Sequence, residues 1–493
     1  MIDHAVDDNT LAVFEQFQRN LDRGDLLNDL RQGLIGEGVM VDGAFGPKPL
    51  VYADYVASGR ALRQVEDFVM SQVLPFYANS HTEASYVGGK MTRMRAAARA
   101  VIARLTGADA GYATIFGGSG ATAGINRLVH LLGVSGEAAR GGKPLVLIGP
   151  YEHHSNILPW RESGAEVIEI GEAASGGPDL AELEAHLAGA ARGRLVVGAF
   201  SLMSNVTGII TDADAVTRLL NRYGAKSVWD CAGSGPYQPI EMKAGTDAQK
   251  DAVIVSPHKF IGGPGASGIL IVRKAAVERE TPVQPGGGTV RFVSPWGHDY
   301  TDSLCAREEA GTPNVIGDIR AALCFLVKDV IGQPEMDRRH TELRTRALDR
   351  WRGNPSIEIL GNPAAPVTVP VFSLRLRDPR TGGYIHQQLV TRMLSDLYGI
   401  QARGGCACAG PYAHRLLGLD RGMSSQLRTA ILSGEETQKP GWTRLNLSVL
   451  LTDEKAGHII QAVDELAANP YPMCEWYACD HATARFKPLG QAA

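Results

Sequence analysis

Between about residues 50 and 330, the sequence alternates short, almost wholly apolar runs with longer stretches of helical periodicity. The apolar runs cover residues 113–116, 144–148, 166–170, 195–200, 227–230, 252–256 and 269–272. Uninterrupted apolar runs are typical of strands buried on both faces, and strands that alternate with helices form mostly parallel sheets. The pattern therefore predicts an α/β fold whose large domain contains a mostly parallel, seven-stranded sheet.

After about residue 330 the pattern changes to a charged helix followed by short strands and further helices. The helices are expected at 336–353, 385–397 and 453–468, and the strands at 367–370, 372–376 and 443–447. This mixture predicts a smaller α+β domain. We therefore divide the chain into a helical lead-in (1–49) that packs on the small domain, a large domain (50–330) and a small C-terminal domain (331–493).

Charge and apolar patterning exclude several classes of protein. The 49 lysines and arginines and the 53 aspartates and glutamates leave a net charge of −4, which argues against a nucleic-acid or anionic-membrane partner. No apolar run reaches the length of a membrane-spanning helix, and the acidic N-terminus does not resemble a signal peptide. The seven cysteines are too few and too scattered for a disulfide framework, so we expect a soluble, cytoplasmic protein.

A lysine and an aspartate follow two of the predicted strands. Ser256-Pro257-His258-Lys259 ends the run 252–256 and precedes a glycine-rich turn, and Asp230 ends the run 227–230. A lysine amine at such a position can form a Schiff base with a carbonyl cofactor, and a carboxylate can pair with a protonated pyridine nitrogen. Taken singly, the lysine also fits a surface turn, and the aspartate also fits a turn cap.

Two further segments are suited to the same kind of ligand. The turn 117–122 (GGSGAT) follows a strand and opens a helix, where free N–H groups bind phosphate, but it lacks the lysine of a nucleoside-triphosphate loop. His153 follows the next strand and is able to stack on an aromatic ring, although it and His154 also fit structural roles. Because adjacent residues in extended chain point to opposite sides, we expect no metal site there.

Together and in this order, these segments resemble the fold type I pyridoxal-phosphate enzymes. More narrowly, they resemble the class V aminotransferase group that contains cysteine desulfurases and selenocysteine lyases. The resemblance rests on residues 52–58 (YADYVAS), 120–126 (GATAGIN), 152–156 (EHHSN), 204–208 (SNVTG), 256–268 (SPHKFIGGPGASG) and 309–314 (EAGTPN). It implies a large and a small domain, pyridoxal 5'-phosphate as cofactor, a small amino-acid substrate and a homodimer.

The resemblance also implies a role for each matching residue. Lys259 would form the Schiff base and move protons, His153 would stack on the cofactor ring, and Asp230 would pair with the ring nitrogen. The phosphate would be held by Ala121, Thr122, Ser256 and His258, and Thr289 of a second subunit would complete the cofactor site. Asn205 would contact both cofactor and substrate, and the substrate would also contact Ala57, Arg403 and Arg444.

The segment 403–411 (RGGCACAGP) resembles the loop that carries the sulfur-accepting cysteine of desulfurases. The cysteine of that loop comes five positions after its arginine, so Cys408 is the expected nucleophile, with Cys406 as the other candidate. A thiolate needs a cationic setting, and Arg403, His414 and Arg415 are near in sequence. Both cysteines also fit a purely packing role, and a zinc or iron–sulfur site is not expected.

The most specific reading is a cysteine desulfurase that converts L-cysteine to L-alanine and leaves a persulfide on Cys408, from which an acceptor protein takes the sulfur. The alternatives are a class V aminotransferase, epimerase or β-lyase without a cysteine nucleophile, and a non-catalytic cofactor-binding scaffold. One position departs from the family, because Gly233 stands where a glutamine usually supports the cofactor hydroxyl, and Ser234 or a water is a candidate substitute. Residues 423–450 are expected to form a surface insertion near the site entrance, and no role is assigned to Cys474 and Cys479.

Overall fold

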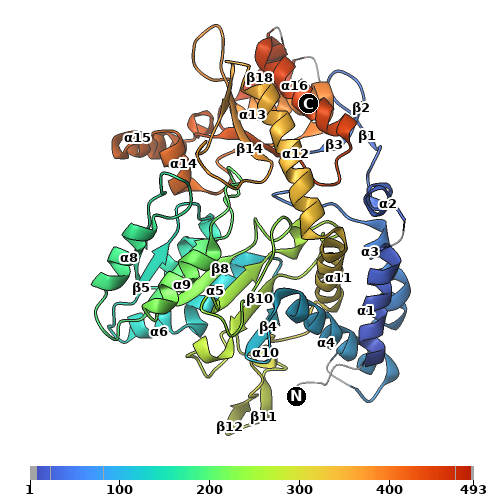
Figure 1. The fold of residues 1–493 in the computed structure, drawn as a ribbon, viewed down its shortest axis with the longest axis vertical. Helices are drawn as coiled ribbons and strands as arrows, with labels where there is room; N and C mark the ends of the chain where they lie inside the picture. The colour runs from blue at the N-terminus through green and yellow to red at the C-terminus, as the bar shows by residue number, and fades with distance from the viewer. Residues whose placement is uncertain (1–7, 23, 81–82, 472, 490–493) are drawn as a thin grey trace.

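A seven-stranded sheet forms the centre of the larger domain in the computed structural model, which describes residues 8–22, 24–80, 83–471 and 473–489 (Figure 1). The strands lie in the order β4-β10-β9-β8-β7-β5-β6, and only β10 is antiparallel to its neighbours. They are β4 (Tyr112–Phe116), β5 (Leu145–Ile148), β6 (Glu166–Glu169), β7 (Val196–Ser201), β8 (Lys226–Asp230), β9 (Ala252–Val255) and β10 (Ile269–Arg273). The predicted mostly parallel sheet is confirmed.

Helices cover both faces of this sheet, because alternate strand residues point to opposite sides. On β10, Ile269 and Ile271 join one core, and Leu270 and Val272 join the other. The first core contains α3 (Arg63–Phe68), α4 (Tyr86–Thr106), α8 (Leu180–Gly189), α9 (Ala213–Arg222) and α11 (Val315–Ile331). The second contains α5 (Ala121–Leu131), α6 (Val134–Ala139), α7 (Leu158–Arg161) and α10 (Leu304–Glu308).

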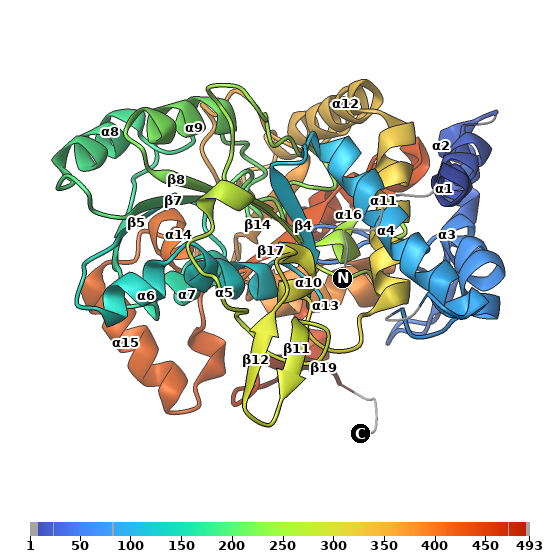
Figure 2. The same cartoon turned by 90° about the horizontal axis from the view of Figure 1, so that it is seen from below.

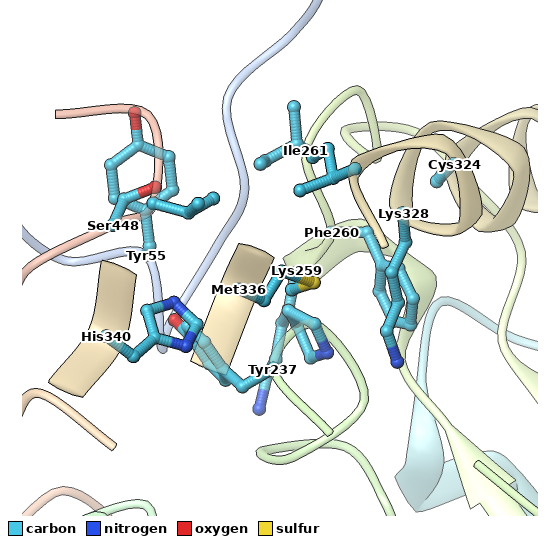
Figure 3. Close-up of a pocket in the computed structure, with 13 residues that line it drawn as sticks. Tyr55, Tyr237, Lys259, Phe260, Ile261, Cys324, Lys328, Met336, His340 and Ser448 are labelled. Carbon is cyan, nitrogen blue, oxygen red and sulfur yellow. The ribbon is translucent and has the colours of Figure 1, made fainter. Parts of the chain in front are cut away.

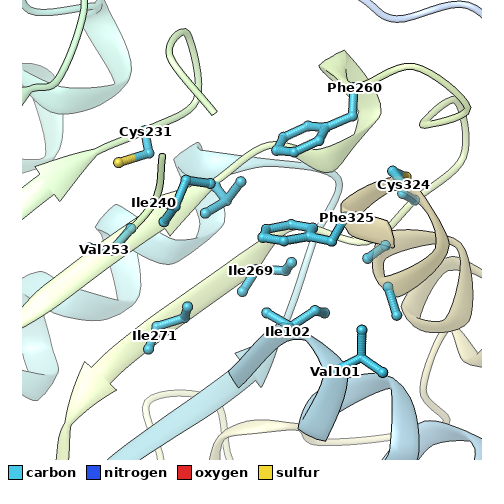
Figure 4. Packing of buried hydrophobic residues seen from close by; sticks show 14 of the residues in the cluster. Val101, Ile102, Cys231, Ile240, Val253, Phe260, Ile269, Ile271, Cys324 and Phe325 are labelled. Carbon is cyan, nitrogen blue, oxygen red and sulfur yellow. The ribbon is translucent and has the colours of Figure 1, made fainter. Parts of the chain in front are cut away.

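The core beneath the predicted cofactor lysine is tightly packed. Phe260, which follows Lys259, stacks on Phe325 of α11 with ring centroids 5.0 Å apart, and Ile269 of β10 lies beside this pair (Figure 4). Val101 and Ile102 of α4 close the same cluster from below. The backbone at Lys259 is thus anchored to buried aromatic rings.

The small domain contains a four-stranded antiparallel sheet in the order β13-β14-β17-β16. Its strands are β13 (Ile357–Ile359), β14 (Val371–Leu376), β16 (Arg403–Gly405) and β17 (Trp442–Asn446). Helices α12 (Gln333–Trp351), α13 (Gln387–Tyr398) and α16 (Asp453–Ala468) contribute to its core, and α14 (Gly410–Leu416) and α15 (Arg421–Leu432) follow the cysteine loop. Figure 1 shows α12 running from the large domain to the small one.

The remaining elements are short. Two-stranded pairs form between β1 (Met40–Val41) and β2 (Lys48–Pro49), β3 (Val51–Tyr52) and β15 (Ile400–Gln401), β11 (Val290–Ser294) and β12 (Gly297–Tyr300), and β18 (Tyr477–Asp480) and β19 (Arg485–Pro488). Single turns are η1 (Val69–Val73), η2 (Leu74–Phe76), η3 (His154–Asn156), η4 (Pro257–Lys259), η5 (Lys274–Ala276), η6 (Glu436–Gln438) and η7 (Met473–Trp476).

The prediction that the lead-in packs on the small domain is wrong for its helices. In α1 (Asp8–Leu21), Phe14 and Phe17 pack on Phe68 in the core of the large domain, and Leu30 of α2 (Leu26–Gly33) joins the same core. The apolar stripe of an amphipathic helix requires a partner but does not specify which one. The end of the lead-in does contact the small domain, where Phe45 packs on its core and Glu37 pairs with Lys455 of α16.

The predicted strand at 367–370 is also wrong. In this segment Thr368 forms only an isolated bridge to Ile209. Pro366 and Pro370 flank the segment and lack the N–H groups that a sheet ladder requires.

Candidate active site

A cavity of about 550 Å³ lies between the two domains, where β4, β5, β7, β8 and β9 end at one edge of the large sheet. Every predicted site residue except Thr289 lines it. These are Ala57, Ala121, Thr122, His153, Asn205, Asp230, Ser256, His258, Lys259, Arg403, Cys408 and Arg444. The structure thus brings together residues from the two domains that are as far apart in sequence as Ala57 and Arg444.

The glycine-rich turn and the start of α5 form a concave surface at one end of this cavity. The backbone N–H of Ala121 donates to Ser256 Oγ at 2.9 Å, and His258 Nδ1 contacts the carbonyl of Ser119 at 2.6 Å. A Cβ at Gly120 would lie 2.9 Å from both Ser256 Oγ and the His258 ring, so the close approach requires glycine. The N–H groups of the first helical turn and the adjacent hydroxyls fit a phosphate group.

Lys259 and Asp230 both line the cavity and interact electrostatically. Burial lowers the pKa of the Lys259 ammonium to about 8, and Arg444 and Arg403 act in the same direction, whereas Asp230 opposes them. Burial also raises the pKa of the Asp230 carboxyl, which accepts a hydrogen bond from the backbone N–H of Ala232 at 2.8 Å. This arrangement provides an amine with a sizeable neutral fraction and a carboxylate that can pair with a pyridinium.

His153 is neutral in this environment, because burial and the neighbouring Lys259 lower its pKa to about 4. Its Nδ1 accepts a hydrogen bond from the backbone N–H of Ser155 at 3.1 Å, which fixes the ring. A neutral, fixed imidazole is suited to stack on an aromatic ring.

Sequence reasoning did not single out Glu152, which supports this part of the site. Its carboxyl group is buried and accepts hydrogen bonds from the Ser201 backbone N–H at 2.7 Å and from the Ser201 hydroxyl at 2.7 Å. It also accepts one from Asn156 Nδ2 at 2.5 Å. Burial raises its pKa to about 8, and its place at the start of the EHHSN segment was the available signal.

Asp54 is a second residue whose role sequence reasoning missed. Its Oδ1 accepts from Arg444 Nη2 and its Oδ2 from Arg403 Nε, both at 2.9 Å. The two arginines are direct register partners on β17 and β16, where like charges repel. Asp54 therefore holds both in place, and the backbone carbonyl of Asn205 accepts from Arg444 Nη1 at 3.0 Å.

The loop that carries Cys408 is fastened to the large domain at three points. Cys408 O accepts from the His154 backbone N–H at 2.8 Å, and His154 Nε2 accepts from the Gly410 N–H at 2.9 Å. Ala407 O accepts from Asn205 Nδ2 at 2.8 Å. Cys408 is exposed and lines the cavity, whereas Cys406 is half-buried and packs in the cluster that contains Tyr412.

Gly233 lines the cavity and leaves open space beside it. A Cβ at this position would lie 3.6 Å from Met203 Cε and 3.7 Å from Asn205 Cβ, which are ordinary contacts. Ser234, the proposed substitute for the missing glutamine, is fully buried and does not line the cavity. No side chain at 233 therefore reaches toward the cofactor hydroxyl.

Thr289 lies outside the cavity of its own chain. It is buried, and its hydroxyl donates to the carbonyl of Gly286 at 2.7 Å. Its contribution to a second subunit stays a prediction.

Other sequence expectations concern the surface and the cysteines. In the segment 423–450, α15 has no buried residue, whereas β17 at its end is wholly buried. All seven cysteines are free thiols, Cys474 and Cys479 among them. Within the described ranges, His, Cys, Asp and Glu side chains form no group of three suited to a metal ion, and every helix is too short or too polar to cross a bilayer.

Lys259 also borders a second, much smaller cavity. This cavity lies among Tyr55, Tyr237, Phe260 and His340 (Figure 3), and its volume is about 20 Å³. That space suits a water molecule rather than a ligand.

The comparisons with known proteins agree with this geometry. The model of the family described as aminotransferase class-V matches residues 51–432. A cysteine desulfurase of Pectobacterium atrosepticum is 30% identical over 371 residues, which cover 74% of this chain and 85% of the relative. A probable cysteine desulfurase of Halalkalibacterium halodurans is 28% identical over 379 residues, which cover 76% of this chain and 87% of the relative.

Solved structures show the same fold. The apo structure of a cysteine desulfurase from Thermococcus onnurineus aligns with a TM-score of 0.71 at 22% identity, covering 90% of this chain and 98% of the other. A cysteine desulfurase from Escherichia coli aligns with a TM-score of 0.68 at 20% identity, covering 90% of this chain and 99% of the other. The α/β architecture of the pyridoxal-phosphate enzymes is therefore confirmed for this chain.

Proposed function

The chain belongs to the class-V aminotransferase family of pyridoxal-phosphate enzymes, and from this premise we propose that it is a cysteine desulfurase with Cys408 as the sulfur acceptor. The observation that carries the proposal is the position of Cys408, which comes from the small domain and lines one cavity with Lys259 of the large domain and Arg444 of its own. Relatives named cysteine desulfurase support the same substrate, L-cysteine.

The cavity has the groups that the cofactor requires. Lys259 would attach it covalently, Asp230 would pair with its ring nitrogen, and His153 would lie on its ring. The turn at Gly120, with Ala121, Thr122, Ser256 and His258, would hold its phosphate. When bound, pyridoxal phosphate supplies an electron sink for the bonds of the substrate α-carbon.

Lys259 is also the residue placed to move protons at that carbon. Its pKa of about 8 leaves part of the amine unprotonated near neutral pH, as a general base requires. His153 stays neutral, so it does not compete with Lys259 for the proton.

Arg444 recognises the substrate carboxylate. Its guanidinium is buried, and two of its N–H groups bind Asp54 and Asn205 O, which leaves others for a bidentate pair with a carboxylate. Arg403 is half-exposed at the cavity mouth and bears a second positive charge. These two charges favour an anionic substrate.

In the overall reaction, the Cys408 thiol takes the sulfur of L-cysteine. The carbon–sulfur bond of the substrate breaks, a sulfur–sulfur bond forms on Cys408, and the substrate carbon gains a proton. L-Cysteine and the thiol thus yield L-alanine and a persulfide, and an acceptor protein or a reductant must then remove the outer sulfur.

A homodimer completes the proposal. The β11–β12 hairpin projects from the body of the molecule (Figure 2). It carries Phe292, Val293 and Trp296, whose exposures are 58%, 62% and 92%. Exposed apolar side chains on a projecting element are typical of a subunit interface, and Thr289 directly precedes this hairpin.

The free cysteines suit a reducing compartment, and we propose that this compartment is the cytoplasm.

The decisive test compares Cys408→Ser with Cys406→Ser in the cofactor-loaded enzyme. Sulfide and alanine released from L-cysteine should fall by orders of magnitude in C408S and stay near the wild-type rate in C406S. Equal activity in wild type and C408S would refute the desulfurase assignment. An amino-acid screen with C408S would then identify an aminotransferase, epimerase or β-lyase.

Attachment of the cofactor to Lys259 has its own test. Protein mixed with pyridoxal phosphate should become yellow, and borohydride should bleach the colour and leave the cofactor covalently attached in wild type but not in Lys259→Ala. If wild-type protein binds no cofactor, both enzymatic readings fail.

A further inference from the structure

Asn446, the last residue of β17, is a buried amide that does not itself line the active-site cavity. Its backbone N–H donates to the carbonyl of Ala53 at 2.8 Å, and its side-chain Oδ1 accepts from the backbone N–H of Val56 at 3.2 Å. Its Nδ2 donates to the hydroxyl of Tyr237 at 3.1 Å. Asn446 therefore connects the small domain to two separate segments of the large one.

The contacts to Ala53 and Val56 lie on either side of Asp54, the partner of Arg444. Arg444 precedes Asn446 by two residues on β17, and residues at this spacing lie on the same face of a strand. Asp54 Oδ1 accepts from Arg444 Nη2 at 2.9 Å. The segment 53–56 and the strand are thus joined by three successive hydrogen bonds, and a shift of the segment would move the Asp54 carboxylate away from the guanidinium.

The segment that Asn446 holds is part of the cavity wall. Val56 and Ala57 both line the cavity. Two residues later, the backbone N–H of Gly59 donates to the carbonyl of His258 at 2.9 Å, directly before Lys259. The segment therefore spans the wall from the carboxylate-binding arginine to the cofactor lysine.

The third contact fixes the orientation of the Asn446 amide. The Val56 N–H can only donate, so the carbonyl oxygen of the amide must face it, and the amino group is left for the Tyr237 hydroxyl. Tyr237 is itself buried, and its carbonyl accepts from Gln333 Nε2 at 2.8 Å at the start of α12. Its ring borders the small cavity beside Lys259 (Figure 3). A rotated amide would lose both side-chain contacts.

We propose that Asn446 is a positioning residue that determines how Arg444 presents its guanidinium to a substrate carboxylate. It acts through the segment 53–56, because its hydrogen bonds on either side of Asp54 hold that carboxylate in place. The inference rests on the proposed function in one respect, the binding of a substrate carboxylate by Arg444, and does not require the sulfur chemistry. Loss of the amide should therefore weaken ligands that carry a carboxylate and leave matched ligands without one nearly unaffected.

The test compares L-alanine with L-alaninamide, which lacks the carboxylate, as ligands of the cofactor-loaded enzyme. Each is titrated while the absorbance of the bound cofactor is followed. In Asn446→Leu, the dissociation constant of L-alanine should rise about tenfold, and that of L-alaninamide should change by less than about twofold. An equal loss for both ligands, no loss for L-alanine, or a wild type that does not prefer L-alanine would each overturn the proposal.

Two further variants complete the comparison. Asn354→Leu is the matched control, because Asn354 makes hydrogen bonds to Asp464 and Ser356 within the small domain and does not line the cavity. It should leave both dissociation constants at their wild-type values. Asn446→Ser keeps a polar group that is too short for both partners, so it tests the same contacts if the leucine variant does not fold, and it should weaken L-alanine selectively.

Sulfide release from L-cysteine, measured on the same samples, separates this inference from the desulfurase assignment. A wild type that prefers L-alanine to L-alaninamide but releases no sulfide would refute the desulfurase assignment alone. Sulfide release by a wild type whose carboxylate preference is unchanged in both Asn446 variants would refute the role of Asn446 alone.

Discussion

His154 Nε2 accepts a hydrogen bond from the backbone N–H of Gly410 at 2.9 Å, and so joins the large domain to the loop that carries Cys408. A Cβ on residue 410 would lie 3.0 Å from this nitrogen, so glycine permits the approach. The loop needs such support, because Ala407 and Cys408 have φ values of 53° and 55°. A left-handed conformation costs a non-glycine residue about 1–2 kcal/mol.

Replacing His154 by leucine should therefore release the loop. The single lost hydrogen bond contributes about 1 kcal/mol, so we expect sulfide release to fall several-fold to about tenfold. The rate at which iodoacetamide alkylates Cys408 should change in parallel, with Cys406 as the internal reference. His154→Gln retains an acceptor and should restore part of both rates. Unchanged alkylation and turnover in H154L would show that the loop does not depend on this contact.

Removing the charge of Asp54 should impair substrate binding more than turnover. In Asp54→Asn, Arg444 and Arg403 lose the carboxylate that separates two adjacent positive charges. Because Arg444 would hold the carboxylate equally in ground and transition states, we expect KM to rise about tenfold with kcat nearly unchanged. Steady-state kinetics with L-cysteine measure this split.

A surface carboxylate provides the control for Asp54. Asp453 pairs with Arg346 and Arg339 at the exposed start of α16, far from the cavity lining. Asp453→Asn should leave KM at the wild-type value. If D54N lowers kcat and leaves KM unchanged, Asp54 acts on the reaction rather than on carboxylate binding.

The strands of the large sheet are predictable from sequence, because most of them are almost uninterrupted apolar runs such as Leu145–Ile148. Site residues that belong to recognisable local segments, such as His153 and Lys259, can be identified from sequence equally well. The roles of Asp54 and His154 cannot be predicted in this way, because their partners Arg444 and Gly410 are 390 and 256 residues away. The packing partner of Phe14 was mispredicted for the same reason, since helical periodicity identifies an apolar face and not its neighbour.

Glu152 should make folding stability depend on pH. Its pKa rises from 4.5 to about 8 on folding, so the folded protein holds a proton that the unfolded chain has lost. Stability therefore falls as pH rises through this range, by at most about 1.4 kcal/mol per pH unit. The lowered pKa of His153 makes stability rise with pH below pH 6.5. The lowered pKa of Lys259 makes stability rise with pH above about pH 8.

Between pH 6.5 and 8, the raised pKa values of the buried carboxyls Asp230 and Asp318 act in the same direction as that of Glu152, so the difference between wild type and Glu152→Gln measures the contribution of Glu152. Urea unfolding of wild type should show stability decreasing across it, and Glu152→Gln, which has no proton to lose, should show a flatter profile. A wild-type profile that rises with pH and is unchanged in E152Q would mean that the carboxyl is ionised in the folded protein.

Gly233→Gln should be accepted by the fold and should strengthen cofactor binding. A Cβ at this position meets no atom closer than 3.6 Å, and the longer side chain extends into the 550 Å³ cavity beside Asn205. One added hydrogen bond is worth about 1 kcal/mol, so the dissociation constant for pyridoxal phosphate should fall about fivefold. Gly233→Leu fills similar space without a donor and should not tighten binding. Thermal unfolding without cofactor should be close to wild type in both variants. If G233Q and G233L bind the cofactor equally, the glycine affects only the shape of the cavity.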